Sequence, residues 1–365
     1  MEEGSARVAL VRGGSRYESV VRALRTIEDS VDLENVRRLL IKPNFVSIER
    51  QLAATHVDAV RAVLDFVRAR YDGPVIVAEG AAVSPTTEGF RRFGYESLVD
   101  EYRVKLVDLN ADETVPVQIY DRRLQPFTVS LARTAVEADY RIAVGPPKTH
   151  DVVIVTLSIK NMVMGMLVNP RAASDGGGIV HKARSTARLI PEWLRRSGVV
   201  EWLKGAILGS TWGSNKMAMH QGVRVINVNL ARVAPHVWPH LAVIDGWRGM
   251  EGEGPSEGEA VEWRVALAGI DPLAVDTATT DLMGFDPEEV GYLQYCRELD
   301  LGTGALEEID LIGNVAPTDV RESFRPHPTY KDQLHWRMEG VERYLEPSQR
   351  GEGSLDFGSI QEQRV

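Results

Sequence analysis

Cysteine is nearly absent from this 365-residue chain, which contains only Cys296. A single cysteine excludes a disulfide within the chain and a cysteine-ligated iron–sulfur cluster, so Cys296 is interpreted as a packing residue. Uncharged apolar runs of about 18 residues are also missing, so no membrane span is expected. Because the first residues, MEEGSARV, lack the basic-then-apolar pattern of a signal peptide, we expect a soluble, cytoplasmic protein.

Basic residues are outnumbered by acidic ones, 42 Lys or Arg against 52 Asp or Glu. The formal net charge is −10 and the pI is about 5.4, which argues against a general nucleic-acid binder. Residues 169–221 are a local exception, with eight Lys or Arg against three Asp or Glu. The expected partner is therefore a small molecule, not a nucleic acid or a membrane, and the sequence leaves a homo-oligomer open.

Several familiar catalytic motifs are missing. No GxGxxG follows the first predicted strand, so a dinucleotide-binding fold is not indicated. The chain has no Walker loop, no HExxH and no Cys/His zinc spacing. It also has no GxSxG, which disfavours a serine hydrolase.

What the chain does contain is a series of apolar runs that end in polar residues. Each has the length of a strand buried on both faces. Segments with helical spacing of apolar residues lie between them, such as 17–29, 55–71 and 222–234. Thr55 is the predicted N-cap of the second. The runs are 39–44, 75–80, 104–110, 140–150 and 241–255. This alternation predicts an α/β fold with a mostly parallel sheet and helices on both faces.

The same pattern suggests how the chain is divided. Residues 1–325 are predicted to form an α/β domain, as one body or as two lobes with 169–221 as a lid or insertion. Three consecutive glycines at 176–178 predict a mobile loop, followed by a helical insertion, within about 170–215. Residues 326–365 are predicted to be an irregular or helical C-terminal tail.

The polar ends of the strands are expected to meet at one edge of the sheet, where open α/β sheets bind ligands. Asp108, Asn110, His150, Asp245 and Glu251 belong to this group with several of the residues below. The residues predicted to bind substrate are Lys42, Asn44, Glu79, Lys148, Thr149, Asn161, Lys182, Gly252 and Gly254.

The segment PKTH (147–150), followed by SIKN (158–161), is the most specific constellation. Lys160 lies in an apolar stretch predicted to be helical from Thr156 to Met166, where burial would lower its pKa. Such a lysine suits proton abstraction, Schiff-base chemistry or covalent attachment of a cofactor. The alternative is a lysine that reaches solvent or pairs with a buried carboxylate. His150 is predicted to carry protons or bind a metal, against the alternative of a hydrogen-bonded structural histidine.

Three further groups complete the candidates. His181, interpreted as catalytic, and Lys182 could close over the site, or they belong to a solvent-exposed basic loop. In GMEGEGP (249–255), interleaved glycines allow a ligand to approach the backbone, and the glutamates favour a cation. Asp245 and Glu251, with Asp276, could bind a divalent metal, although Asp276 could instead support a helix. The cofactor is otherwise unknown.

These motifs resemble the domain-of-unknown-function family number 362 over roughly residues 7–315. IKPNFVS, PPKTHDVVIVTLSIKNMVMG and IDGWRGMEGEGPSEG carry the resemblance. Many members of that family contain ferredoxin-like cysteine clusters, which this chain lacks. A more distant similarity is to lactate racemase, which also has a histidine ten residues before a lysine, as His150 and Lys160 are here. In that family the lysine anchors a nickel-pincer nucleotide, but this chain lacks the surrounding glycine-rich and Pro-Gly sequences.

Two functional hypotheses follow. In the first, the chain is an enzyme, of isomerase-like or oxidoreductase-like type, that uses His150 and Lys160 on a small polar, anionic metabolite. In the second, the same cleft belongs to a non-catalytic ligand-binding or accessory protein.

Overall fold

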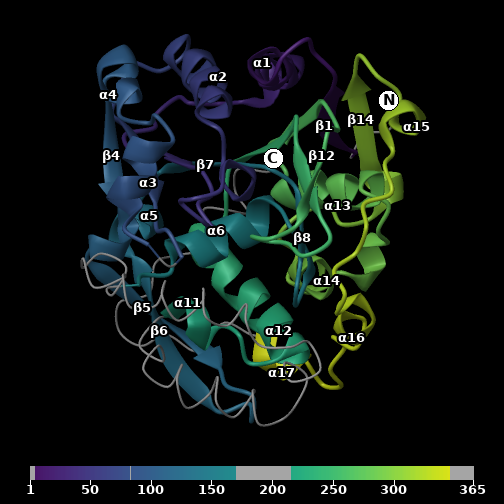
Figure 1. Cartoon of the computed structure of the whole chain (residues 1–365). Coiled ribbons are helices and arrows are strands. Elements are labelled where there is room, and N and C mark those ends of the chain that lie inside the picture. The colour runs from purple at the N-terminus through teal and green to yellow at the C-terminus, as the bar shows by residue number, and fades with distance from the viewer. Residues whose placement is uncertain (1–4, 83, 170–214, 346–365) are drawn as a thin grey trace.

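The computed structural model describes residues 5–82, 84–169 and 215–345. Its main feature is an eight-stranded sheet, shown with its helices in Figure 1. In spatial order the strands are β14 (Ile309–Gly313), β1 (Ala6–Val11), β13 (Val265–Gly269), β10 (Leu241–Gly246), β7 (Tyr140–Gly145), β2 (Leu39–Lys42), β3 (Val75–Glu79) and β4 (Val104–Asp108). Strand β13 is antiparallel to both neighbours and the other five pairs are parallel, which confirms the predicted sheet.

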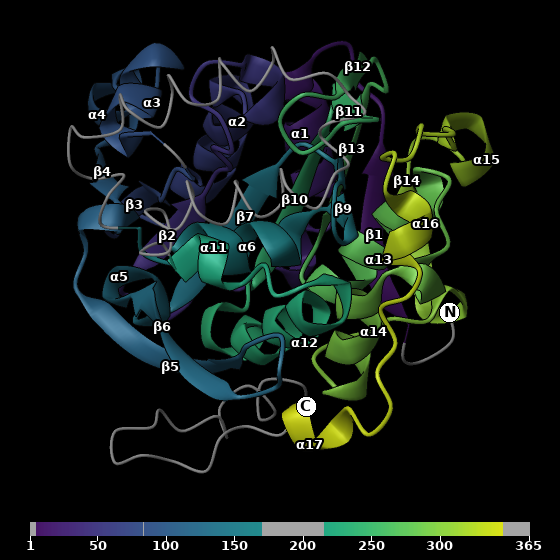
Figure 2. The same cartoon turned by 60° about the horizontal axis from the view of Figure 1, so that its bottom comes forward.

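Helices cover both faces of this sheet, as predicted. Alternate residues of each strand face opposite ways, so Ala9 and Val11 join one apolar cluster while Val8 and Leu10 join the other. The first cluster packs under α1 (Arg16–Thr26), α2 (Val57–Arg68), α3 (Thr86–Arg92) and α4 (Ser97–Tyr102). The second packs under α6 (Ser158–Met166), α12 (Val223–Val233), α13 (Pro272–Leu282) and α14 (Gly291–Glu298) (Figure 2).

Shorter elements surround these layers. A hairpin of β5 (Thr114–Tyr120) and β6 (Pro126–Ala132) lies beside α12, where Asn229 bonds the backbone of Tyr120. The remaining short helices are α5 (Arg133–Val136), α11 (Asn215–Ala218), α15 (Pro317–Val320), α16 (Tyr330–Gln333) and α17 (Glu342–Leu345). None of the described helices combines the length and apolar character needed to cross a bilayer.

A small second sheet departs from the prediction. Residues 140–150 do not form one strand, because β7 ends at Gly145 and β8 (Lys148–His150) joins a different sheet. Pro146 and Pro147 lie between them, and proline has no N–H to continue a ladder. In this sheet β8 pairs with β9 (Ile154–Thr156) and with β11 (Gly249–Glu251), which in turn pairs with β12 (Glu259–Val261). The polar residues of 147–150 are therefore displaced from the end of β7.

The start of α2 also differs from the prediction. The helix begins at Val57, and its N-cap is His56, whose side chain accepts from Asp58 N. Thr55 is buried just before it, donates to Val144 O at 3.0 Å and accepts from Asn44 N at 2.8 Å. Thr55 therefore joins the ends of β7 and β2 instead of capping α2.

Candidate functional site

Helix α6 carries two of the predicted site residues, and a carboxylate from another helix fixes where it begins. Asp276 in α13 accepts from Ser158 N at 2.9 Å, Ser158 Oγ at 2.6 Å and Ile159 N at 2.9 Å. Free N–H groups at a helix start favour a negative partner. The helix therefore starts at Ser158, and Thr156 lies on β9 instead of sharing a helical face with Lys160.

A buried network joins α6 to the ends of β2 and β3. The amine of Lys42 donates to Glu79 Oε2 at 2.5 Å and to Asn161 Oδ1 at 3.1 Å. Asn161 Oδ1 also accepts from Asn44 Nδ2 at 3.0 Å. All four side chains are buried, so four predicted substrate-binding residues do lie together. Most of their polar atoms, however, are already bonded to one another.

Lys148 extends this network into the second sheet. Its amine donates to Asn44 Oδ1 and, at 3.1 Å, to Ala53 O. Burial is the main reason that its pKa falls to about 7, and the charge of Lys160 lowers it further. Lys148 and Lys160 thus lie close enough for their charges to repel each other.

The amine of Lys160 is in a different situation. The side chain is 5% exposed, and its amine has no hydrogen-bond acceptor within residues 5–82, 84–169 and 215–345. Burial lowers its pKa to about 8, and the charge of Asp151 opposes this shift. Two donors close to it in sequence are also without a partner, Asn161 Nδ2 and Thr156 Oγ1. Buried donors normally have acceptors, so this group has the composition of an oxyanion site.

His150 lies on β8, the same short strand as Lys148. Burial is the largest cause that holds its pKa well below the usual value, and the Lys160 charge is the next. Val152 N donates to His150 Nδ1 at 3.0 Å, which places the proton of the neutral ring on Nε2. The half-exposed carboxylate of Asp151 also lies 3.0 Å from Nδ1. We assign the tautomer from the Val152 amide, which the backbone holds in place.

A second histidine, His220, lies close to the same lysine. Burial and then the charge of Lys160 lower its pKa. Its Nδ1 lies 3.0 Å from Lys216 O, so Nδ1 carries the proton of the neutral ring and Nε2 can accept one. The site therefore contains one imidazole that donates through Nε2, His150, and one that accepts through Nε2, His220.

The GMEGEGP segment packs against PKTH, as predicted from the sequence. Thr149 Oγ1 donates to Gly252 O at 3.0 Å. A Cβ on Gly254 would lie 2.1 Å from Thr149 O, so only glycine permits this approach. The N–H of Gly252 is donated to Arg325 O, and that of Gly254 to Gly252 O. Direct contact between these glycines and a substrate stays a prediction.

The two carboxylates predicted as metal ligands each pair with a different arginine. Asp245 accepts from Arg16 Nε at 2.8 Å and is buried. Glu251 Oε2 accepts from Arg325 N at 2.9 Å. Within the described residues, no three His, Cys, Asp or Glu side chains are grouped so that they could hold a metal ion. Cys296 is buried in α14, and its pKa is raised by burial, in keeping with a packing role.

One buried lysine near this network, Lys216 in α11, was not predicted. Its amine donates to Met164 O at 2.8 Å and Gly165 O at 3.4 Å, the free carbonyls at the end of α6. Helix α6 is thus held by a carboxylate at its start and an amine at its end. No local sequence signal marks Lys216, because its partners lie about 50 residues away. His181 and Lys182 lie outside the described residues.

The C-terminal segment also contributes to the site. Gln333 is 1% exposed, and its Nε2 donates to His150 O at 2.9 Å and Thr329 Oγ1 at 2.8 Å. Its Oε1 accepts from Ile154 N. A single amide thus bridges β8 and β9 from outside the hairpin, so residues beyond 325 support the strand that carries His150. The proposed division of the chain at that point stays a prediction.

Replacing Gln333 with methionine is expected to loosen this hairpin. The variant keeps the volume but leaves Ile154 N and His150 O without partners, at a cost of about 1–3 kcal/mol. Hydrogen exchange at the Ile154 amide should therefore accelerate. Gln294→Met, at a buried glutamine that bonds Pro287 O, is the matched control. Equal exchange at Ile154 in both variants would contradict the bridging role.

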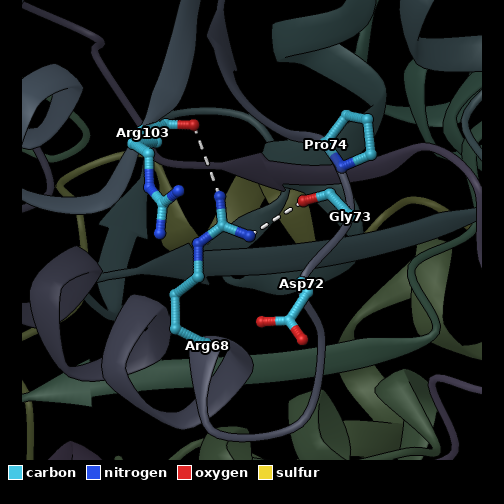
Figure 3. A pocket seen from close by; sticks show the side chains of 5 residues that line it. All are labelled: Arg68, Asp72, Gly73, Pro74 and Arg103. Atoms are coloured by element: carbon cyan, nitrogen blue, oxygen red, sulfur yellow. Dashed lines mark hydrogen bonds between the residues drawn. The ribbon is translucent and has the colours of Figure 1, made fainter.

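Two surface depressions lie away from the lysines. One, of about 250 Å³, is lined by Arg68, Asp72, Gly73, Pro74 and Arg103 (Figure 3). It lies at the amino ends of β3 and β4, opposite the expected ligand edge, and Arg68 is committed to the carbonyls of Gly73 and Arg103. The other, of about 240 Å³, is lined by Gly252 and Glu253 of the GMEGEGP segment and by Arg325, and by none of these lysines. The buried cluster therefore remains the candidate site.

Together these features define an α/β protein with a buried group of lysines and histidines beside the ends of its parallel strands. The chain belongs to the family described as Domain of unknown function (DUF362), whose profile matches residues 39–281. The match includes Lys42, Lys148, His150 and Lys160 but ends before Gln333. Comparison with curated proteins gives no match.

One similar solved structure is that of the lactate racemase apoprotein from Thermoanaerobacterium thermosaccharolyticum. Its TM-score is 0.40 and its sequence identity 14%, over 81% of this chain and 57% of that one. The chain thus spans little more than half the length of that protein.

Proposed function

We propose that the lysine–histidine cluster binds a small anionic molecule and carries out acid/base chemistry on it. The single observation that carries this proposal is the buried side chain of Lys160, whose amine has no hydrogen-bond acceptor within the described residues. An anionic group of a ligand would supply that acceptor. Lys42, in contrast, already has its carboxylate in Glu79.

The protonation states support the chemistry. A lysine with a pKa of about 8 is present in both forms near neutral pH, so it can bind an anion when charged and take a proton when neutral. His150 is neutral there and presents Nε2–H as a donor. His220 presents the opposite tautomer, with a free Nε2. One group can therefore donate while another accepts, as proton transfer requires.

Oxalate is a suitable probe, because it keeps its double negative charge from about pH 6 to about pH 9. Its affinity, measured by calorimetry, should fall as the pH rises through about 8, because the lysine amine then loses its charge. The variant Lys160→Met should bind oxalate at least about tenfold more weakly and lose this pH dependence. Lys105→Met, at an exposed lysine of β4, is the control.

Oxalate binding that is equally tight in Lys160→Met and in the unmodified chain would refute the proposed site. Once a substrate is known, measuring its turnover distinguishes an enzyme from a non-catalytic ligand-binding protein. Binding that is lost in Lys160→Met, without any conversion of the bound substrate, would favour the non-catalytic ligand-binding protein.

A further inference from the structure

Four lysines of the described chain are buried near the carboxyl ends of the sheet, and three of them are held by acceptors. Lys42 donates to Glu79, Asn161 and Pro43 O. Lys148 donates to Asn44 and Ala53 O, and Lys216 to two carbonyls of α6. Only Lys160, among these four, has no acceptor in the described residues. An amine that is not fixed by acceptors can turn its nitrogen lone pair toward a ligand.

We propose that Lys160 is a nucleophile that forms an imine with a small oxo acid bound in this site. The inference rests on the proposed function, because the site must first admit an anion. It adds a substrate class, a molecule that carries both a carboxylate and a reactive carbonyl, and it assigns the nitrogen of Lys160 the bond-forming role.

The surroundings of Lys160 favour its neutral, nucleophilic form. Ile159, Met162 and Val163, which lie beside Lys160 along α6, are all buried apolar residues. Burial holds the pKa of Lys160 at about 8, and Asp151, the one carboxylate that opposes this shift, is half exposed and so well solvated. Lys42 is a poorer nucleophile, because its amine faces the carboxylate of Glu79, which favours the charged form of the amine.

The chemistry balances without an oxidant or a reductant. The Lys160 nitrogen attacks the carbonyl carbon, a C–N bond forms, and the C=O π bond breaks to give a carbinolamine. The nitrogen loses both of its protons, the C–O bond breaks, and the oxygen leaves as water. The products are therefore one imine and one water. His150 presents its Nε2–H as a hydrogen-bond donor for the departing oxygen.

Donors close to Lys160 in the sequence suit the rest of such a ligand. Asn161 Nδ2 and Thr156 Oγ1 are buried without partners, and Lys148 lies opposite Thr156 in the pairing of β8 with β9. A carboxylate can accept from several of these groups at once. The site would thus hold the acid group while the adjacent carbonyl meets Lys160, which makes a 2-oxo acid the simplest fitting ligand.

Reductive trapping tests the inference on the full chain. The protein is incubated with glyoxylate or pyruvate and sodium cyanoborohydride, which converts an imine into a stable secondary amine. Intact mass spectrometry should show one adduct, and peptide mapping should place it on Lys160 with at least about tenfold more label than on the exposed Lys105. Oxalate should protect Lys160, and acetone, which lacks the carboxylate, should label it weakly.

Two variants test whether the adduct depends on Lys160. Lys160→Met should lose the adduct, whereas Lys105→Met, at an exposed lysine of β4, should keep it. Mapping of the unmodified chain decides the question even where a variant does not fold. Label absent from Lys160, or no stronger there than at Lys105, overturns the inference. If oxalate still binds in that case, the imine fails and the proposed anion site stands. If oxalate does not bind either, both fail.

Discussion

Replacing Glu79 with leucine is expected to destabilise the folded chain by about 3–5 kcal/mol, the usual cost of leaving a buried charge without its partner. Glu79 is 2% exposed and Lys42 is completely buried. Burial lowers the pKa of Lys42, and the negative charge of Glu79 is the largest effect that opposes this. Without Glu79, the amine must either remain charged in an apolar surrounding or give up its proton.

A double-mutant cycle separates this pairing from simple loss of packing. Lys42→Met alone should also destabilise the chain, because it leaves Glu79 Oε2 and Asn161 Oδ1 short of a donor. The double variant Lys42→Met/Glu79→Leu should be less destabilised than the sum of the two single variants, because no buried charge remains. Urea unfolding of the three variants and the unmodified chain measures the coupling.

The exposed pair Arg22–Glu18 on α1 provides the control for this cycle. Both side chains are close to half exposed, so solvent screens their charges. Arg22→Met, which removes this pair but keeps the bond from Gly14 N to Glu18 at the start of α1, should leave the unfolding midpoint essentially unchanged. If the effects at Lys42 and Glu79 simply add, the two residues do not act as a pair and the network around Asn161 has been misassigned.

The sheet could be predicted from local sequence patterns, because the length of an apolar run and the spacing of apolar residues both depend on residues close together in the chain. Apolar runs of strand length, separated by helical periodicity, were sufficient to indicate β2, β3, β4, β7 and β10 and their mostly parallel arrangement. The helix that carries Lys160 and Asn161 was predicted within two residues of its observed start. The approach of the GMEGEGP segment to PKTH also followed, because both segments leave the ends of adjacent strands.

Long-range partners could not be predicted in this way. Nothing near Asp245 in the sequence indicates that Arg16 pairs with it, and nothing near His150 indicates Gln333. The shift of residues 148–150 into a second sheet depends on strands β9 and β11, which are only three residues long and carry little periodic signal. Each of these features arises from contacts between distant parts of the chain.

A large pH effect is expected from Asp276. Burial raises its pKa to about 7, against about 3.9 in an unfolded chain, even though the bonds from Ser158 and Ile159 lower it. Between these values the folded chain binds a proton that the unfolded chain releases. The Asp276 contribution to the free energy of unfolding is therefore fully present below about pH 4 and is lost as the pH rises through about 7, by up to a few kcal/mol.

Asp276→Asn should remove this contribution. Asparagine cannot titrate, and its Nδ2 would face the Ile159 N–H that now donates to Oδ2, so the variant should also lose about 1–3 kcal/mol of stability. Urea unfolding at four pH values between about 4.5 and 7.5 should give a shallower slope in the variant than in the unmodified chain.

Asp286→Asn is the matched control, because Asp286 is an exposed N-cap of the short helix Pro287–Glu289 and asparagine serves equally well at an N-cap. This control should keep the slope of the unmodified chain. A slope that is unchanged in Asp276→Asn would mean that the carboxylate at the start of α6 does not titrate in this range. The group that anchors the start of α6 would then keep one charge state throughout this pH range.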